Sequence, residues 1–304
     1  MSNRFTSAIK GVAASAALVL NIFVMFPLLI AVALVKLVVP LSPVRKVTDR
    51  IMNGIAEIWV SNNNAWIRMV QPNRWQVSGD VSTLRRQGWY LVSSNHQSWV
   101  DILVLQRVFN RRIPLLKFFL KRQLIYVPIM GLAWWALDFP FMRRGGGGNA
   151  AKDLATARKA CEKFRIIPTS VISFVEGTRF TPAKHDVQKS PYQSLLKPKV
   201  GGLAMALATL GDRFDAMLDI TIIYPGGVPT FVDLLCGRVK DVVVQVDQVR
   251  IPVEFQVAEE LRPADYRPRL QAWVNELWAK KDQDLVAMKA RFHRGEKPAG
   301  TFEV

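Results

Sequence analysis

A long apolar run occupies the start of the chain, where residues 11–35 contain no charged side chain. The run exceeds the ~20 apolar residues that a helix needs to cross a bilayer, and it is too long for a cleaved signal peptide. Pro27 lies within it, where a proline is expected to kink or break a helix. We therefore expect a bent, re-entrant or half-inserted helix as readily as a straight membrane span.

Residues 48–70 have a different pattern, with apolar side chains three and four positions apart as in an amphipathic helix. Such a helix could pack on the protein surface, or it could lie on lipid headgroups with tryptophans at the boundary. The apolar run directly before it favours the second interpretation, so we expect residues 1–72 to form a membrane anchor. The apolar residues expected to share one face are Ile51, Ile55, Ile58, Trp59, Trp66 and Met69.

From residue 73 onward, short apolar runs alternate with stretches of helical periodicity. This alternation is typical of an α/β domain whose mostly parallel sheet is flanked by helices, and we expect one such domain over residues 73–304. Strands are expected at 75–79, 88–94, 169–177, 218–225 and 241–251, with a strand that turns into a helix at 113–121. Helices are expected at 99–109, 149–164 and 201–211, with a basic amphipathic helix at 263–297.

One further apolar stretch, residues 126–142, is too short and too interrupted for a membrane span. It could form a core helix. Its adjacent tryptophans, Trp134 and Trp135, are also typical of shallow membrane insertion or of a groove for a lipid chain. Both interpretations stay open at this point.

The charge balance indicates an anionic partner. The 304 residues hold 41 Lys and Arg against 24 Asp and Glu, a formal net charge of +17. Nucleic acid, an anionic membrane and an acidic substrate all fit such a balance, but a nucleic-acid-binding protein has no use for the apolar run at 11–35. We therefore expect the charge to face a membrane and a substrate. Two cysteines, Cys161 and Cys236, imply no disulfide framework, and the three histidines show no zinc-ligand spacing.

The polar run NHQSWVD, residues 95–101, separates an expected strand from an expected helix. If Ser98 caps that helix, Asp101 occupies its third position and the two residues form a variant of the capping box. This interpretation leaves His96 without a role. In the turn before the helix, His96 could reach Asp101, which would accept the proton of one imidazole nitrogen and leave the other nitrogen as a base. Such a base could activate a hydroxyl group without a metal.

A second polar run, SFVEGTRF at residues 173–180, leaves an expected buried strand. It could be an ordinary surface turn with a charged rim. The end of a strand is also where α/β proteins place ligand contacts, and an arginine such as Arg179 suits a phosphate through its paired donors. Glu176 and Arg179, which flank Gly177, are therefore candidate ligand contacts.

A third run, FMRRGGGGNAAKD at residues 141–153, invites comparison with a phosphate-binding P-loop. The comparison fails because the required Gly-Lys-Ser/Thr sequence is absent after the glycines. We interpret the glycines as a flexible loop. Arg143 and Arg144 are either an anion site, which we favour, or a solvated pair. The chain also lacks a Gly-x-Ser-x-Gly elbow, which disfavours a serine hydrolase.

These runs together resemble the motifs of the PlsC-type glycerolipid acyltransferases, the lysophosphatidic acid acyltransferases. NHQSWVD resembles their NHx4D motif and SFVEGTRF their FPEGTR motif, while FMRR and ITIIYPGG resemble the blocks between and after these two. The resemblance covers residues 80–235. The block WWALDFPFMRR and the Lys-His pair after GTRFTPA make it closest to the bacterial YihG branch. The chain departs from the pattern at Val175, where proline is usual, and at Phe180, where a small polar residue often follows the arginine.

The resemblance implies a membrane-bound O-acyltransferase. It would move a fatty acyl group from acyl-CoA or acyl-carrier protein to the sn-2 hydroxyl of 1-acylglycerol 3-phosphate, giving phosphatidate for phospholipid biosynthesis or remodelling. It implies that His96 deprotonates the hydroxyl, that Asp101 orients His96, and that no cofactor or metal takes part. The residues implied to bind the acceptor are Arg143, Arg144, Glu176, Gly177, Thr178 and Arg179, with Arg144 and Arg179 on its phosphate.

The resemblance also implies a location, because acyl thioester donors are cytosolic. We expect a bacterial inner (cytoplasmic) membrane, with the catalytic domain facing the cytoplasm, an anionic bilayer as partner, acyl-carrier protein as a potential further partner, and no nucleic acid. Three alternatives stay open: transfer to another lysophospholipid, a lipid esterase that uses His96 with water, and a non-catalytic basic membrane adaptor. The His96–Asp101 pair and the arginine turn are both intact, which favours an enzyme over an adaptor.

Overall fold

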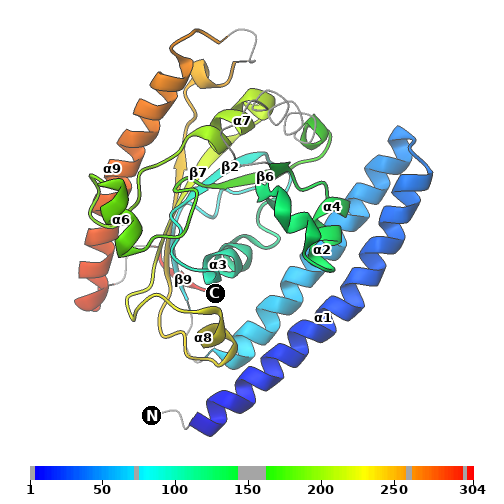
Figure 1. Cartoon of the computed structure of the whole chain (residues 1–304), viewed down its shortest axis with the longest axis horizontal. Helices are drawn as coiled ribbons and strands as arrows, with labels where there is room; N and C mark the ends of the chain where they lie inside the picture. The colour runs from blue at the N-terminus through cyan, green and yellow to red at the C-terminus, as the bar shows by residue number, and fades with distance from the viewer. Residues whose placement is uncertain (1–3, 72–74, 143–161, 258–261, 297–299) are drawn as a thin grey trace.

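The computed structural model describes residues 4–71, 75–142, 162–257, 262–296 and 300–304. Figure 1 shows a twisted sheet in the middle of the molecule, with two long helices along one side and a third long helix on the other. The pair is α1 (Arg4–Val38) and α2 (Ser42–Val70), and the third is α9 (Tyr266–His293), which confirms the helix expected near the C-terminus. Arg143, Arg144, most of the helix expected at 149–164 and the domain boundary expected at 72 lie outside the described residues.

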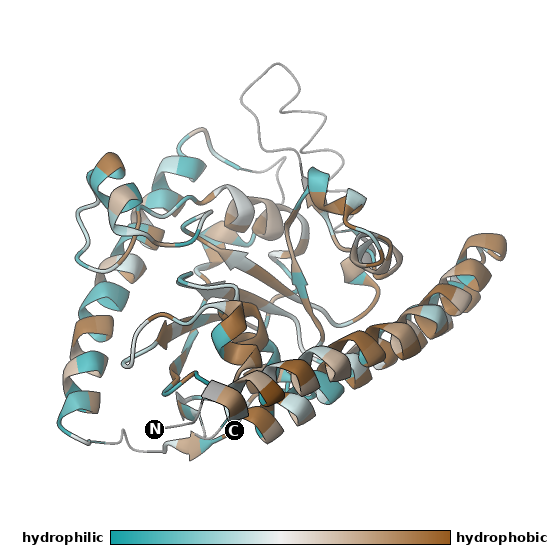
Figure 2. Ribbon diagram, turned by 60° about the horizontal axis from the view of Figure 1, so that its bottom comes forward, coloured by the Kyte–Doolittle hydropathy of each residue, from teal (hydrophilic) through white to brown (hydrophobic). Residues whose placement is uncertain are grey.

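α1 is one continuous helix that includes Pro27. The break expected at this proline is therefore wrong. Ala14, Leu29 and Ala33 are buried against the body of the protein, so packing along the whole length of α1 holds the helix where the proline ring removes one hydrogen bond. Among the described residues, Phe5–Val38 is the one helix long and apolar enough to cross a membrane. Figure 2 shows its outer surface as largely hydrophobic.

α2 runs antiparallel to α1 and confirms the amphipathic helix expected there. Asn21 ties the two helices together, because its side-chain amide donates to the Asn63 side chain at 3.0 Å and to the carbonyl of Trp59 at 3.0 Å. Apolar side chains occur on both sides of this helix, and of the residues expected to share one face Trp66 is buried against the body. Ile51, Ile58 and Met69 are exposed, and the buried apolar residues are Met52, Ala56, Val60, Trp66, Ile67 and Val70.

The main sheet has seven strands in the order β3-β6-β2-β7-β8-β1-β9. β3, β6, β2 and β7 are parallel to one another, and β1 is parallel to β8, while β8 is antiparallel to β7 and β9 is antiparallel to β1. This confirms the mostly parallel sheet expected from the alternation of strands and helices. The strands are β1 (Gln76–Gly79), β2 (Tyr90–Ser94), β3 (Leu116–Phe118), β6 (Ser170–Phe174), β7 (Ala216–Ile223), β8 (Val243–Val249) and β9 (Phe302–Glu303).

Helices cover both faces of the sheet because successive strand residues point to opposite faces. In β2, Val92 packs in one cluster with residues of α1, α2 and α3 (Val100–Phe109). Its neighbour Leu91 packs in a second cluster with residues of α7 (Gly201–Leu210) and α9. The strand residues are therefore buried on both sides, as the nearly continuous apolar runs of the sequence indicate.

The stretch 126–142 forms only one short helix, α4 (Met130–Ala136). Ala133 and Ala136 are buried in a third apolar cluster with residues of α1 and α2, whereas Trp135 is exposed. The other short elements are α6 (Pro182–Gln188), α8 (Phe231–Leu235), the 3-10 turns Arg122–Tyr126, Lys163–Arg165 and Val253–Phe255, and a small sheet of β4 (Leu120–Lys121) and β5 (Phe141–Met142).

Candidate active site

The four parallel strands end at one edge of the sheet, and the conspicuous polar runs of the sequence begin there. His96 follows β2, Glu176 follows β6 and Tyr224 follows β7. The carboxyl edge of a parallel sheet is the usual place for ligand contacts in α/β proteins. The topology thus brings together residues that are about eighty and about 130 positions apart in the sequence.

Asn95 fixes the position from which the site is built. Its side chain continues the pairing of β2 with β7, since Nδ2 donates to the carbonyl of Ile222 at 2.9 Å and Oδ1 accepts from the Ile222 N–H at 2.8 Å. Because Asn95 is almost completely buried, both of its polar ends need such partners. The next residue, His96, is therefore held at the rim of the sheet.

His96 and Asp101 form the pair that the sequence predicts. His96 Nδ1 lies 2.8 Å from Asp101 Oδ2, and Asp101 is completely buried in the first turn of α3. A carboxylate in contact with Nδ1 fixes a neutral imidazole with its proton on that nitrogen, which leaves Nε2 able to accept a proton.

The helix-capping role considered for this run also holds in part. α3 begins at Val100, and the Ser98 hydroxyl accepts from the Val100 N–H at 3.1 Å, not from the Asp101 N–H as a capping box would require. Asp101 Oδ2 nevertheless accepts from the Ser98 N–H at 2.9 Å and from the Gln97 N–H at 2.6 Å. One carboxylate oxygen therefore orders the start of the helix and the imidazole together.

Two aromatic residues complete the surroundings of the pair. Tyr224 donates its hydroxyl to Asp101 Oδ1 at 2.5 Å, and burial raises the pKa of Tyr224 well above its usual value, so it remains a donor. Phe174 stacks on the His96 ring with 3.9 Å between the ring centroids and 14° between the planes. The imidazole is thus held by one hydrogen bond in its plane and by one aromatic face, and 13% of its side chain remains exposed.

Glu176 holds the main chain of His96 from the interior of the protein. It is completely buried, with Oε1 accepting from the His96 N–H at 2.7 Å and Oε2 from the Leu196 N–H at 2.9 Å. Burial raises the pKa of Glu176 to about 7, although the two backbone hydrogen bonds lower it. The structure therefore excludes the alternative interpretation in which Glu176 lies on a charged surface rim. The sequence does not show that two backbone N–H groups reach this carboxylate. They belong to His96, eighty positions earlier, and Leu196, twenty positions later.

The rest of the turn presents positive charge. Gly177 has φ +69°, a left-handed conformation that favours glycine. The Lys184 ammonium donates to the Thr178 hydroxyl at 2.8 Å and to the Arg179 carbonyl at 2.9 Å. Arg179 itself is exposed, with its guanidinium 5.0 Å from the ring centroid of Trp99. The structure thus places Thr178 within the turn and Arg179 at its surface, close to the start of α3.

A hydrogen bond from the Phe180 N–H to the His96 carbonyl, at 2.7 Å, closes the turn over the histidine. Of the residues predicted for the site, the structure brings together His96, Asp101, Glu176, Gly177, Thr178 and Arg179. Sequence reasoning missed Asn95, Tyr224 and Phe174. Tyr224 could have been suspected as the polar residue that ends the apolar run of β7, but its contact with Asp101 depends on the order of the strands.

The chain is similar in sequence to known acyltransferases. Residues 76–226 match the family model described as Acyltransferase. A 1-acyl-sn-glycerol-3-phosphate acyltransferase 2 from Arabidopsis thaliana is 27% identical over 264 residues, which cover 80% of this chain and 63% of that protein. The 1-acyl-sn-glycerol-3-phosphate acyltransferase delta of Mus musculus is 27% identical over 206 residues, which cover 63% of this chain and 51% of that protein. The chain thus spans between half and two thirds of the length of these relatives.

A solved structure supports the fold. The crystal structure of the 1-acyl-sn-glycerophosphate (LPA) acyltransferase PlsC from Thermotoga maritima matches 92% of this chain and 98% of that chain, with a TM-score of 0.52 and 18% sequence identity. At this identity the likeness concerns the fold, which includes the long N-terminal helices as well as the sheet.

Proposed function

The chain belongs to the acyltransferase family, and from this premise we propose that it moves a fatty acyl group from an acyl thioester to the sn-2 hydroxyl of 1-acylglycerol 3-phosphate. The observation that carries the proposal is the contact of 2.8 Å between His96 Nδ1 and the buried Asp101 carboxylate. This contact leaves Nε2 as the base that a hydroxyl nucleophile needs. The products are phosphatidate and the free thiol of the donor.

The reaction proceeds without a covalent intermediate on the protein. His96 Nε2 takes the proton of the acceptor hydroxyl as its oxygen attacks the thioester carbonyl. The tetrahedral intermediate then collapses, the carbon–sulfur bond breaks, and the leaving thiolate takes the proton back from the imidazolium. A general base of this kind typically contributes ~10²–10⁴ in rate, and positioning of the two substrates supplies much of the rest.

Of the residues that the structure describes, Arg179 is the one best placed for the acceptor phosphate. It is exposed on the turn that Glu176 and Phe180 fasten to His96, and a guanidinium pairs with phosphate through parallel hydrogen bonds. Gly177 and Thr178 shape this turn. The predicted contribution of Arg143 and Arg144 stays a prediction, as does the finer resemblance to the YihG branch.

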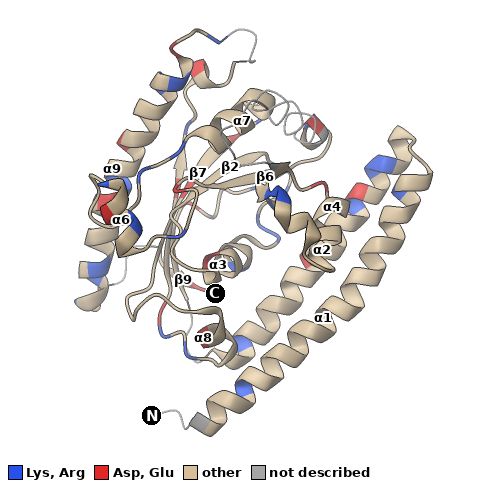
Figure 3. Cartoon of the chain, viewed as in Figure 1, with Lys and Arg blue, Asp and Glu red and all other residues tan. Residues whose placement is uncertain are grey.

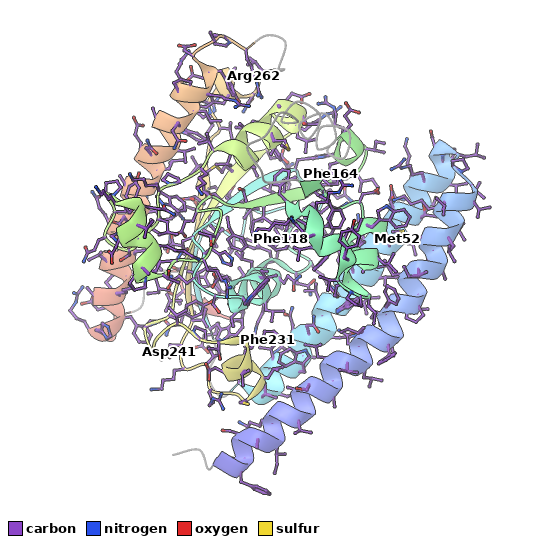
Figure 4. All side chains as sticks on the ribbon, viewed as in Figure 1. Met52, Phe118, Phe164, Phe231, Asp241 and Arg262 are labelled. Atoms are coloured by element: carbon purple, nitrogen blue, oxygen red, sulfur yellow. The ribbon has the colours of Figure 1, made fainter. Side chains whose placement is uncertain are left out.

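An aromatic row suggests where an acyl chain lies. Phe118 is 6.0 Å from Phe174 and 6.5 Å from Phe139, between ring centroids, and Phe174 stacks on His96. Phe118 packs against the apolar cluster that α4 forms with α1 and α2, and Figure 4 shows it between the sheet and Met52 of α2. The row thus leads from the base toward the apolar helices.

We further propose that α1 lies along the surface of a membrane, next to the catalytic domain, and does not span the bilayer. Near its start, the Lys10 ammonium donates to the Val70 carbonyl at 3.2 Å. Near its end, Lys36 forms ion pairs with Asp49 and Asp138. A helix fastened to the body at both ends cannot span a bilayer while the body stays in water. Its exposed apolar side chains, almost free of charge between the ends (Figure 3), would then enter one leaflet.

Cytosolic thioester donors place the catalytic domain on the cytoplasmic face of a bacterial inner membrane. Either acyl-CoA or acyl-carrier protein would serve as donor. The charge of +17 would hold the domain on an anionic surface, since basic residues near such a surface each contribute about 1 kcal/mol.

The proposal is tested by thiol release from oleoyl-CoA with the detergent-purified protein, in the presence and absence of lysophosphatidate. Release that requires lysophosphatidate is the expected result. Release at the same rate without an acceptor would identify a thioesterase instead. Release with lysophosphatidylglycerol or lysophosphatidylcholine, but not with lysophosphatidate, would keep the reaction and replace the acceptor.

A further inference from the structure

α8 is a short helix that presents apolar side chains to the outside. Thr230 caps it, because the Thr230 hydroxyl accepts from the Asp233 N–H at 3.1 Å and the Asp233 carboxylate accepts from the Thr230 N–H at 2.9 Å. The cap fixes the orientation of the helix. Phe231 and Val232 are 38% and 57% exposed, and Val228, in the loop just before the helix, is 54% exposed. Three apolar side chains within five residues therefore point to solvent from an ordered element.

The inner side of α8 packs on α1. Leu234 is completely buried and shares an apolar cluster with Ala14, Ala17 and Leu18 of α1. The two elements approach closely, since a Cβ atom on Gly11 would lie only 2.9 Å from Cys236 Sγ. Figure 1 shows α8 beside the first half of α1. The exposed residues of α8 thus lie next to α1, whose exposed apolar residues include Phe5, Ile9, Val12, Val19, Leu20 and Phe23.

The same loop is fastened to the candidate active site. The Ser98 hydroxyl donates to the Pro229 carbonyl at 2.6 Å, and Pro229 lies between Val228 and Thr230. Ser98 is two residues from His96 and next to Trp99, which is 54% exposed. The loop before α8 therefore links the turn that holds His96 to the helix that packs on α1.

We propose that α8 and the loop before it form a second membrane-docking element, which inserts Val228, Phe231 and Val232 into the headgroup boundary of an anionic phospholipid bilayer beside α1. Trp99 would lie at the same boundary, where tryptophan is favoured, and the exposed Lys240, five residues after α8, would add positive charge near lipid phosphates. The docking holds the mouth of the His96 site against the leaflet that contains the lysolipid. This role for the site rests on the proposed function, whereas the insertion itself does not.

Exposed apolar side chains also occur in other parts of the molecule, so exposure alone does not identify a docking surface. Val253 is 68% exposed and Val187 is 85% exposed, but they lie on the Val253–Phe255 turn and on α6, away from α1. Figure 4 labels Phe231 beside α8 in the lower half of the view and Arg262, near the Val253 turn, at its top. The two outlying valines are therefore matched controls, since they have the same side chain and at least the same exposure as Val232.

Insertion can be measured with a fluorophore on single cysteines. Val232→Cys and Val253→Cys would each be placed in a Cys161→Ser/Cys236→Ser background, labelled with an environment-sensitive dye, and reconstituted in phosphatidylcholine/phosphatidylglycerol vesicles. We expect shallow doxyl-labelled lipid to quench the dye at 232 and to leave the dye at 253 unquenched. Equal quenching at both sites, or none at 232, would overturn the proposal. Blue-shifted emission at 232 without lipid quenching would assign the surface to a second copy of the chain or another protein, and would also overturn it.

The consequence for the site is tested with Phe231→Ser/Val232→Ser against Val187→Ser/Val253→Ser. With lysophosphatidate in vesicles, we expect the first pair to raise the lysolipid concentration for half-maximal thiol release about tenfold, because insertion strength scales with buried apolar area. In detergent micelles both pairs should match the wild type. An equal loss in vesicles and micelles would overturn the docking role, because the residues would then act on the fold or the site. If the wild type released no thiol in either format, the proposed function would fail, and the quenching result would still decide the docking.

Discussion

Asp101 and Glu176 are both completely buried, and both hold His96, but they hold different parts of it. Asp101 contacts the imidazole ring, and Glu176 accepts a hydrogen bond from the main-chain N–H of the same residue. Asp101 belongs to the first turn of α3, and Glu176 to the turn after β6. One histidine is thus fixed from two sides by carboxylates that are 75 residues apart.

The two carboxylates differ in how many donors surround them. Asp101 accepts from four groups, namely the His96 ring, two backbone N–H groups and the Tyr224 hydroxyl. Glu176 accepts from two backbone N–H groups, and burial raises its pKa to about 7. In the proposed mechanism the first carboxylate orients the ring whose other nitrogen takes up the proton, while the second supports the backbone. Replacing the two should therefore affect rate and stability differently.

The largest effect on the rate is expected from replacing Asp101. Asp101→Asn keeps the shape of the side chain but can stabilise the wrong tautomer of His96, so kcat should fall roughly 10³–10⁴-fold. Thiol release measures this, with Asp186→Asn on the exposed α6 as control. A loss below tenfold would mean that Asp101 serves only to order the start of α3, and the contrast between the two carboxylates would disappear.

The next largest effect is expected on stability, from replacing a residue of α9 whose charge acts on Glu176. Lys281 is buried and forms an ion pair of 3.0 Å with Asp219 of β7, and its charge lowers the pKa of Glu176. Lys281→Met leaves Asp219 buried without its cation, which should cost about 3–5 kcal/mol of the free energy of unfolding.

Thermal unfolding in detergent measures the loss at Lys281. Lys281→Met/Asp219→Asn, which removes both charges, should recover most of it. A double variant as unstable as the single variant would show that the Lys281 side chain stabilises the fold by packing. Its charge would then have no part in the effect.

Arg179 belongs to the same turn as Glu176, but Glu176 is buried and Arg179 is exposed. Arg179→Ala removes a charge-assisted contact worth about 1.5–3 kcal/mol, so KM for lysophosphatidate should rise on the order of 10–100-fold with little change in kcat. The control is Arg250→Ala, an exposed arginine after β8. If both variants had the same KM as the wild type, Arg179 would have no part in binding the acceptor.

The smallest effect on rate is expected for Glu176→Gln. The glutamine still accepts one backbone hydrogen bond but presents N–H groups to the other donor, and the resulting shift of the His96 backbone should lower kcat about tenfold, within the ~1–3 kcal/mol cost of a lost buried partner. Positioning of a base should leave KM nearly unchanged.

The same substitution has a signature in the dependence of stability on pH. The folded protein binds the Glu176 proton more tightly than the unfolded chain, since the pKa rises from 4.5 to about 7. Stability therefore falls as the pH rises from about 4.5 to about 7, by on the order of 3 kcal/mol from this group. Glu176→Gln should remove that part of the slope in thermal unfolding at several pH values. An identical slope in both proteins would show that Glu176 does not titrate in this range.

The sequence predicts the local parts of this arrangement and misses the distant ones. His96 and Asp101 are five positions apart with a helix start between them, so a strand-to-helix turn suffices to bring them into contact. The contact of Glu176 with the His96 N–H depends on β6 lying next to β2, which no local pattern specifies. For the same reason the sequence does not indicate the contact of Tyr224 with Asp101 or the burial of Glu176.

The helical anchor shows the same limit. The apolar run of α1 and the amphipathic pattern of α2 are readable from the sequence, but the face that α2 buries is not. Ile51 and Met52 are adjacent and both apolar, and the body of the protein decides that Met52 is buried. Similarly, Pro27 predicts a break only for a helix without support, and the packing of Leu29 and Ala33 supplies that support.

The most direct test of the central claim compares His96→Ala with His293→Ala in lysophosphatidate-dependent thiol release from oleoyl-CoA. His293 is an exposed histidine at the end of α9, so the two variants lose the same side chain at different places. We predict that His293→Ala keeps the wild-type rate, and that His96→Ala loses transfer while thermal unfolding shows that it is folded. Normal transfer by folded His96→Ala would contradict the role of His96 as the base.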